Sequence, residues 1–129
     1  VPGSLLPGIA RLARARRQLR LTVDAVKLPH HASANNVSAE LIDAVSSPRW
    51  LISTNGSQHD HPDPQAVARV LRANAGRGIR LGFNYPKGTN PHADRWADPR
   101  TREQWGYEAD YAPDALAGLT VDLDDDVSV

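Results

Sequence analysis

The chain has 129 residues, enough for one domain, and its 15 basic and 15 acidic side chains give a formal net charge of zero. It contains no cysteine, which excludes a disulfide framework, zinc held by thiolates and a cysteine nucleophile. No apolar run approaches the roughly 18 to 20 residues of a membrane span, and the first residues lack the layout of a signal peptide. We therefore expect a cytoplasmic protein that does not bind membranes.

The charges are unevenly placed along the chain. Residues 1–23 carry arginines and no acid, whereas residues 108–129 carry acids and no base. Either the arginines bind an acidic partner such as nucleic acid, or the two ends of the chain neutralise each other. No aromatic residue interleaves with the run from Arg11 to Arg20, so a platform on which bases could stack is not indicated.

The first half of the chain predicts a helix, a strand and a second helix. Residues 5–20 have an apolar stripe of helical period, made of Leu5, Ile9, Leu12 and Leu19. Residues 19–28 read as a strand that ends at a proline, and residues 36–47 as a short helix capped by Asn36 or Ser38.

The second half continues the alternation. We expect a strand over 49–54, then a helix with Asp63 as N-cap, Pro64 in its first turn and Gly76 as C-cap. Three more strands are predicted over 79–84, 107–112 and 116–123. Residues 85–106 read as a long surface loop with one short helix near 100–104, because they are rich in Pro, Asn, Gly and Asp.

Strands that alternate with helices indicate an α/β layered fold, with a mixed sheet and flanking helices. We assign residues 1–123 to one domain and residues 124–129 to a flexible acidic tail.

Four of the five histidines lie in two short clusters, "PHHAS" and "HDHPD". In the first, adjacent side chains on an extended backbone point to opposite sides, so His30 and His31 do not easily bind one metal together. In the second, His59 and His61 share a face if the backbone is extended. Each cluster taken alone is also compatible with surface histidines, or with the start of a helix.

The two clusters occupy equivalent places in the predicted fold, because each follows a strand and precedes a helix. If the two strands are parallel, both clusters lie at the same edge of the sheet, where α/β proteins bind ligands. Imidazole suits zinc, manganese or iron, so the pattern favours a metal or acid/base site at that edge.

The segments around these clusters resemble the C-terminal half of metallo-β-lactamase-fold hydrolases. The matching elements are Lys27, His30-His31-Ala32-Ser33, Ser53-Thr54-Asn55-Gly56 and His61-Pro62-Asp63. The nearest subgroup is similar to the hydrolase domain of bacterial competence DNA-uptake proteins, and the later "GFNYP" and "RWADP" are similar to its tail. The resemblance covers about residues 5–123 and implies part of an αββα sandwich.

The resemblance also implies a site with one or two zinc ions that activate a water molecule for hydrolysis. It assigns a metal-ligand role to His30 or His31, and a role near the metals to His61, in substrate contact, orientation or acid/base catalysis. Lys27, Ser33, Asn55 and Asp63 are implied as residues that orient the site or contact substrate.

The chain departs from the family pattern in two ways. Ala32 replaces a glycine, and the principal motif His-x-His-x-Asp-His is absent, together with the later metal-bridging aspartate. We therefore expect a C-terminal portion that is inactive without an N-terminal half and that by itself binds metal only weakly. Such a portion would leave an apolar sheet face open to that half or to a second copy of the chain. The alternative is a non-catalytic interaction module that keeps the scaffold and has lost the metal site.

Overall fold

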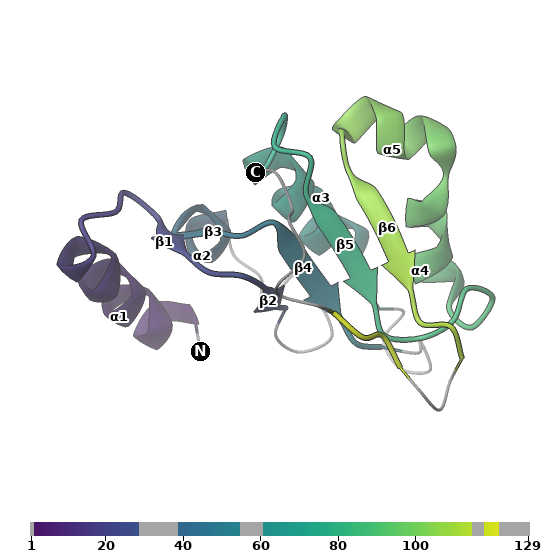
Figure 1. Ribbon diagram of the computed structural model, residues 1–129, viewed down its shortest axis with the longest axis horizontal. Helices are drawn as coiled ribbons and strands as arrows, with labels where there is room; N and C mark the ends of the chain where they lie inside the picture. Colours follow the sequence, from purple (N-terminus) through teal and green to yellow (C-terminus); the bar gives the residue numbers. More distant parts are fainter. Residues whose placement is uncertain (1, 29–38, 55–60, 115–117, 122–129) are drawn as a thin grey trace.

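The computed structural model describes residues 2–28, 39–54, 61–114 and 118–121, and it has an α/β architecture (Figure 1). Its main sheet contains four strands in the order β2-β4-β5-β6, namely β2 (Val26–Lys27), β4 (Arg49–Ile52), β5 (Arg80–Phe83) and β6 (Glu108–Tyr111). The expectation of a mixed sheet is wrong for the described part of the chain, because every strand pair there is parallel. The physical reason is that helical crossovers connect successive strands and return the chain to the same end of the sheet.

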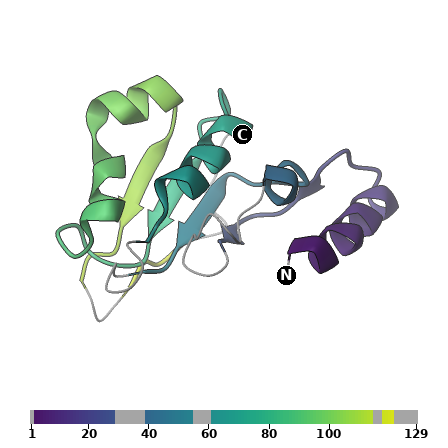
Figure 2. The same cartoon turned by 180° about the vertical axis from the view of Figure 1, so that it is seen from behind.

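Helices occupy these crossovers. Helix α3 (Pro64–Ala73) links β4 to β5 and covers one face of the sheet, as Figure 2 shows. Helix α4 (Pro91–Asp94), the 3₁₀ helix η2 (Arg95–Ala97) and helix α5 (Pro99–Trp105) link β5 to β6. Among the described helices, none combines the length and apolar character that crossing a bilayer would require.

The hydrophobic core lies between the sheet and α3. Side chains alternate along each strand, so one set from β4 and β5 faces the helix. These residues are almost fully buried, as are their partners on α3; they are Trp50, Ile52, Leu81 and Phe83 on the strands, and Ala66, Val67, Val70 and Leu71 on the helix. Burial of each large side chain stabilises the fold by roughly 1.5–3 kcal/mol.

The predicted strand over 19–28 is in fact two short strands in different sheets. Strand β1 (Leu21–Thr22) pairs with β3 (Val45–Ser46), whereas β2 pairs with β4. Helix α2 (Ala39–Asp43) is therefore shorter than expected, since Val45 and Ser46 leave the helix to form β3. Residues 19–28 have a continuous strand-like sequence, but they form two strands because their two ends pair with different partners.

Helix α1 (Pro2–Ala15) begins and ends earlier than predicted, with Pro7 inside it. Ala13 is buried, whereas Leu12 and Leu19 of the expected stripe are 42% and 105% exposed. Arg17 has a positive φ of 57° just beyond the helix, and Leu19 follows the helix end. The predicted stripe is confirmed only at Ile9, which is partly buried against the core; α1 packs chiefly against β1 and α2.

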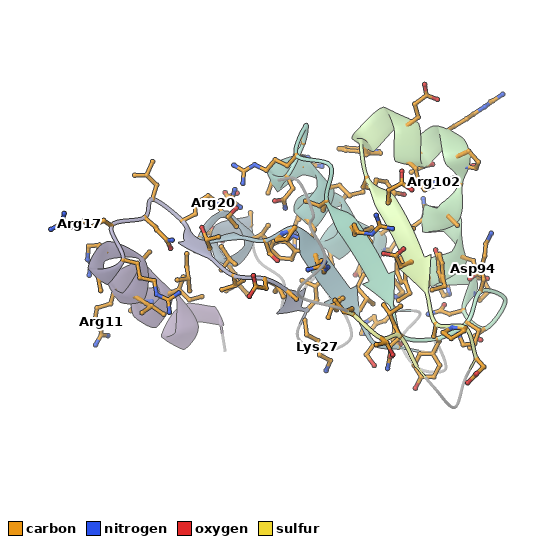
Figure 3. All side chains as sticks on the ribbon, viewed as in Figure 1. Arg11, Arg17, Arg20, Lys27, Asp94 and Arg102 are labelled. Atoms are coloured by element: carbon orange, nitrogen blue, oxygen red, sulfur yellow. The ribbon has the colours of Figure 1, made fainter. Side chains whose placement is uncertain are left out.

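Arg20 has a structural role within the basic N-terminal region. Its guanidinium donates hydrogen bonds to the carbonyl oxygens of Asp43 at 2.9 Å, Ile42 at 3.1 Å and Val45. The arginine thus satisfies carbonyl groups at the end of α2 that the helix itself leaves unpaired. Arg11 and Arg17, by contrast, extend into solvent from the region of α1 (Figure 3).

Residues 85–106 contain more helix than the single short segment predicted. Asn90 and Asp98 act as N-caps, and each is followed by a proline at the first helical position. Gly106 ends α5 with a φ of 69°, a conformation that glycine adopts without strain. The richness in Pro, Asn and Asp that indicated a loop is therefore a series of helix caps.

Two further boundaries differ from the sequence predictions. Helix α3 ends at a C-cap formed by Asn74 in place of Gly76. The last predicted strand, over 116–123, is absent from its described part, residues 118–121, which have no strand structure.

The predicted start of α3 is confirmed. Asp63 is the N-cap, and its Oδ1 accepts a hydrogen bond from the backbone N–H of Gln65 at 3.0 Å. We expect Asp63→Ala to lower the free energy of unfolding by about 1 kcal/mol through loss of this cap, and Asp63→Asn to preserve most of it. Urea denaturation measures both variants; equal stability of Asp63→Ala and the wild type would contradict the capping role.

Buried tyrosines give the fold a dependence on alkaline pH. Tyr107 is buried and its hydroxyl donates a hydrogen bond to the carbonyl oxygen of Trp96 at 2.6 Å. Burial raises the pKa of Tyr107 to about 12 from its ordinary value of 10.0, because the ionised form loses solvation. Folding therefore favours the protonated phenol, and this stabilisation is complete below pH 10 and lost as the pH rises toward 12.

We expect the free energy of unfolding to fall more steeply above pH 10 in the wild type than in Tyr107→Phe. At neutral pH the variant should be less stable by about 1 kcal/mol, because it lacks the hydrogen bond to Trp96. Urea titrations at several alkaline pH values measure both effects. The same pH dependence in the two proteins would contradict the assignment to Tyr107.

Candidate functional site

The carboxyl ends of three neighbouring strands meet at one edge of the sheet. Strand β2 pairs in register with β4, with Val26 beside Trp50 and Lys27 beside Leu51. Beyond these pairs, the N–H of Leu28 donates to the carbonyl oxygen of Leu51 at 2.9 Å, and the N–H of Asn84 to that of Ile52 at 3.0 Å. The chain therefore leaves β2, β4 and β5 at adjacent points.

The structure describes three of the residues that the sequence assigns to a site. Lys27 is the last residue of β2 and is exposed; its side chain extends outward from the end of the strand (Figure 3). His61 is half-buried and is separated from the first residue of α3 by Pro62 and Asp63, and Asp63 caps the helix. His30, His31, Ser33 and Asn55 lie outside the described residues, so their expected roles remain predictions.

Asn90 connects several segments at this edge of the sheet, and we did not predict this role from the sequence. Its side-chain Nδ2 donates to the carbonyl oxygens of His61 at 2.7 Å and Thr54 at 3.3 Å, while Oδ1 accepts from the N–H of His92 at 3.0 Å. Asn90 is itself only 1% exposed. One buried amide thus fixes the backbone at His61 against the start of α4. The signal was present in the sequence as Asn90-Pro91, an N-cap followed by a first-turn proline.

We expect Asn90→Ala to lower the free energy of unfolding by about 2–4 kcal/mol, because it removes a helix cap and also the hydrogen bonds from a buried amide to the carbonyl oxygens of Thr54 and His61. Asp98→Ala is a matched control, since it removes the N-cap of α5 at an exposed position, and should cost about 1 kcal/mol. Chemical denaturation compares the two. If Asn90→Ala costs no more than Asp98→Ala, the contacts with Thr54 and His61 do not stabilise this edge.

The face of the sheet away from α3 carries charged side chains, whereas we expected the open face of the sheet to be apolar. Register and alternation place Lys27, Arg49, Arg80 and Asp110 on this face. The Arg80 guanidinium forms two bonds of 2.8 Å to the carboxylate of Asp110, from Nε and from an NH2 group. The reason for the difference is that most apolar residues of β4 and β5 alternate onto the side that packs against α3, and Leu51 is the exception.

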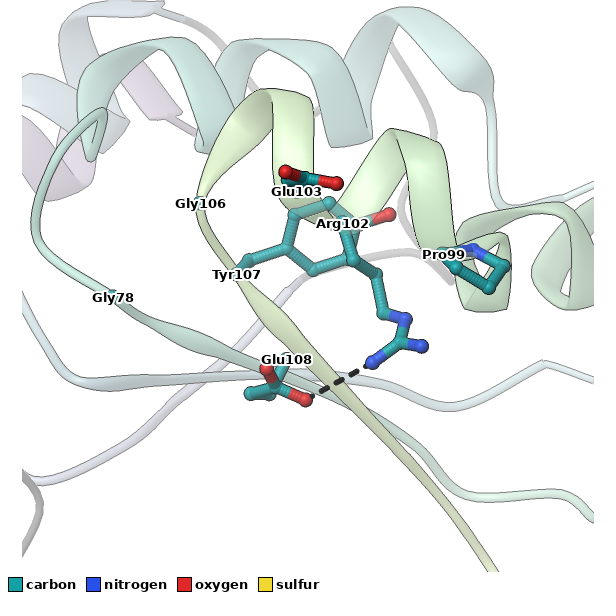
Figure 4. A pocket seen from close by; sticks show the side chains of 7 residues that line it. All are labelled: Gly78, Pro99, Arg102, Glu103, Gly106, Tyr107 and Glu108. Atoms are coloured by element: carbon teal, nitrogen blue, oxygen red, sulfur yellow. Dashed lines mark hydrogen bonds and ion pairs between the residues drawn. The ribbon is translucent and has the colours of Figure 1, made fainter.

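A hollow of about 500 Å³ lies between α5 and the start of β6, at the amino end of that strand (Figure 4). Two of its three charged residues interact with each other, because Arg102 forms an ion pair of 3.2 Å with Glu108. The hollow is open to solvent and lies away from the ends of β2 and β4. It therefore takes no part in the candidate site.

The described residues do not by themselves form a metal site. Within residues 2–28, 39–54, 61–114 and 118–121, no group of three or more His, Asp or Glu side chains could hold a metal ion. Of the two histidine clusters, this part of the chain includes His61 alone. The described edge provides a scaffold onto which the segments with His30, His31 and His59 are attached.

Comparisons with models of known protein families, with curated proteins and with solved structures found no match to this chain.

Proposed function

We propose that the chain is the C-terminal portion of a metal-dependent hydrolase similar to the metallo-β-lactamase superfamily, in which a metal-activated water attacks an ester, phosphodiester or similar bond. The observation that carries the proposal is the parallel pairing of β2 with β4. This pairing brings together the exits of two strands, each followed in sequence by one of the two histidine clusters.

The residues have distinct roles in this proposal. His30 or His31 supplies a metal ligand, and zinc would polarise the scissile bond and lower the pKa of a bound water. His61 lies near the metal as a substrate contact or acid/base group, because Asn90 fixes its backbone at the same edge. A catalytic zinc normally has three protein ligands, so the remaining ligands come from an N-terminal half. Without that half the chain has no hydrolytic activity.

The layered arrangement of the described residues is compatible with half of an αββα sandwich. Helix α3 covers one face of the main sheet, and the opposite face carries no helix among the described residues. In the proposed complete domain, the second sheet would pack on this open face. Its charged residues favour a partner sheet with complementary charges over a purely apolar one.

The same charged face supports a second candidate function, a non-catalytic module that binds a partner through the open sheet. Arg80 and Asp110 are partly exposed on neighbouring strands and form an ion pair. A polar face of this kind suits an interface whose specificity comes from charge. In that case the histidine clusters would bind no metal.

Zinc titration by calorimetry separates the two functions. We expect the chain to bind zinc weakly, since it supplies only part of a ligand set, and His30→Ala/His31→Ala to abolish this binding. His92→Ala is the control, because it removes a histidine from the same edge and leaves both clusters intact. Zinc binding that persists in the double variant, or that is absent from the wild type, would contradict the ligand assignment and favour the non-catalytic module.

A further inference from the structure

A small cavity lies on the open face of the sheet, next to the ends of β2, β4 and β5. Its volume is about 210 Å³, below the roughly 300–1,000 Å³ of sites that hold drug-sized ligands. Three polar residues line it, one from each strand or the position just after it: Lys27, Ser53 and Asn84. Its remaining lining is largely apolar and includes Leu51, Leu119 and Val121.

The register of the sheet explains why these polar groups converge. Lys27, Leu51 and Gly82 lie side by side in one row across three parallel strands. Two residues further along β4 and β5, Ser53 and Asn84 follow on the same face. Asn84 donates from Nδ2 to the Ser53 hydroxyl at 3.4 Å, a long contact that places an amide N–H and a hydroxyl side by side at the cavity.

The segment Gly118–Val121 forms the outer wall of the cavity. The N–H of Leu119 donates to Oδ1 of Asn84 at 2.8 Å, which anchors this segment to the end of β5. Gly82 permits the close approach, because a Cβ there would lie 2.7 Å from Cδ2 of Leu119. Gly118 has a φ of 66°, and a Cβ at that position would lie 2.8 Å from Oδ1 of Asn84. Two glycines thus allow an apolar wall to lie over the sheet.

The charge balance around the cavity favours an anion. Asp110 lies on the same face, in register with Gly82, but its carboxylate is bound by Arg80 through two bonds of 2.8 Å. Lys27, which is exposed and lines the cavity, contributes a positive charge at its rim. An ammonium, a hydroxyl and an amide are together suited to bind the oxygens of a carboxylate or phosphate.

We propose that this cavity binds a small ligand with an anionic head, a carboxylate or phosphate, and a short apolar tail. The Lys27 ammonium pairs with the head, Asn84 and Ser53 hydrogen-bond its oxygens, and Leu51, Leu119 and Val121 contact the tail. No metal and no histidine takes part in this binding, although Lys27 is also one of the residues that the resemblance assigns to the hydrolase site.

Chemical labelling of lysines tests the proposal directly, since Lys27 and Lys87 are the only two lysines of the chain. The chain is acetylated with and without hexanoate, hexyl phosphate or hexanol, and each lysine is followed by mass spectrometry. We expect hexanoate, hexyl phosphate or both to slow acetylation of Lys27 but not of Lys87, and hexanol to protect neither. Protection by one anion alone identifies the head group as carboxylate or phosphate. Absence of protection by both anions at millimolar concentrations would overturn the proposal.

Two variants then distinguish the contribution of the anionic head from that of the apolar tail, and calorimetry measures the affinity for the ligand that protects Lys27. Lys27→Gln should weaken binding by about tenfold, the effect of losing one charge-assisted contact, whereas Lys87→Gln should leave it unchanged. Leu119→Ala should weaken binding of the hexyl compound more than binding of acetate or inorganic phosphate. Equal binding by Lys27→Gln and Lys87→Gln, or equal protection by acetate or inorganic phosphate, would contradict the assigned roles.

Discussion

Parallel pairing of β4 with β2 on one side and β5 on the other is the constraint on which the rest of the structure depends. The alternation of side chains along β4 sends Trp50 and Ile52 into the core against α3, and Arg49 and Leu51 to the opposite face. The same pairing aligns the carboxyl ends of the three strands. One set of backbone hydrogen bonds therefore places the core on one face and the candidate site and the cavity at one end.

Side-chain amides fasten the segments that follow these strands. Asn90 binds the carbonyl oxygens of Thr54 and His61 and caps α4, and Asn84 binds Leu119 and Ser53. A buried polar group that lacks partners costs free energy, so each amide strongly favours the arrangement in which its bonds are made. These asparagines fix the positions of the segments that follow the strands, and a binding site requires side chains held in fixed positions.

The elements whose local signal agrees with their tertiary environment were predictable. Strands β4 and β5 have compact apolar sequences, and α3 has Asp63 and Pro64 at its start; all three lie near the positions that the sequence indicated. The apolar stripe predicted for the first helix is confirmed only in part, because Ile9 packs against the core, whereas Leu12 is exposed and Leu19 lies beyond the end of α1. The strand over 19–28 failed because its two ends pair with different partners, which depends on the position of β3 and not on local sequence.

The candidate site was predictable in one respect and missed in another. Strand order along the chain and equivalent placement of the two histidine clusters were enough to predict that the strands before them end at one edge. The contributions of Asn84 and Asn90 were not predicted, because each acts through contacts across 29 to 36 residues of sequence. Likewise, the role of Gly82 comes from the close approach of Leu119, whose Cδ2 would lie 2.7 Å from a Cβ at position 82, and no local sequence pattern encodes that approach.

The candidate site depends on the parallel pairing of β2 with β4, because this pairing makes the segments that follow both strands start at one edge. Solution NMR of the isotopically labelled chain tests it most directly, through cross-strand nuclear Overhauser effects and the exchange of backbone amide hydrogens. We predict contacts that pair Val26 with Trp50 and Lys27 with Leu51, together with slow exchange of the Leu28 amide. An antiparallel pattern, or a Leu28 amide that exchanges as fast as in an unfolded peptide, would contradict the account.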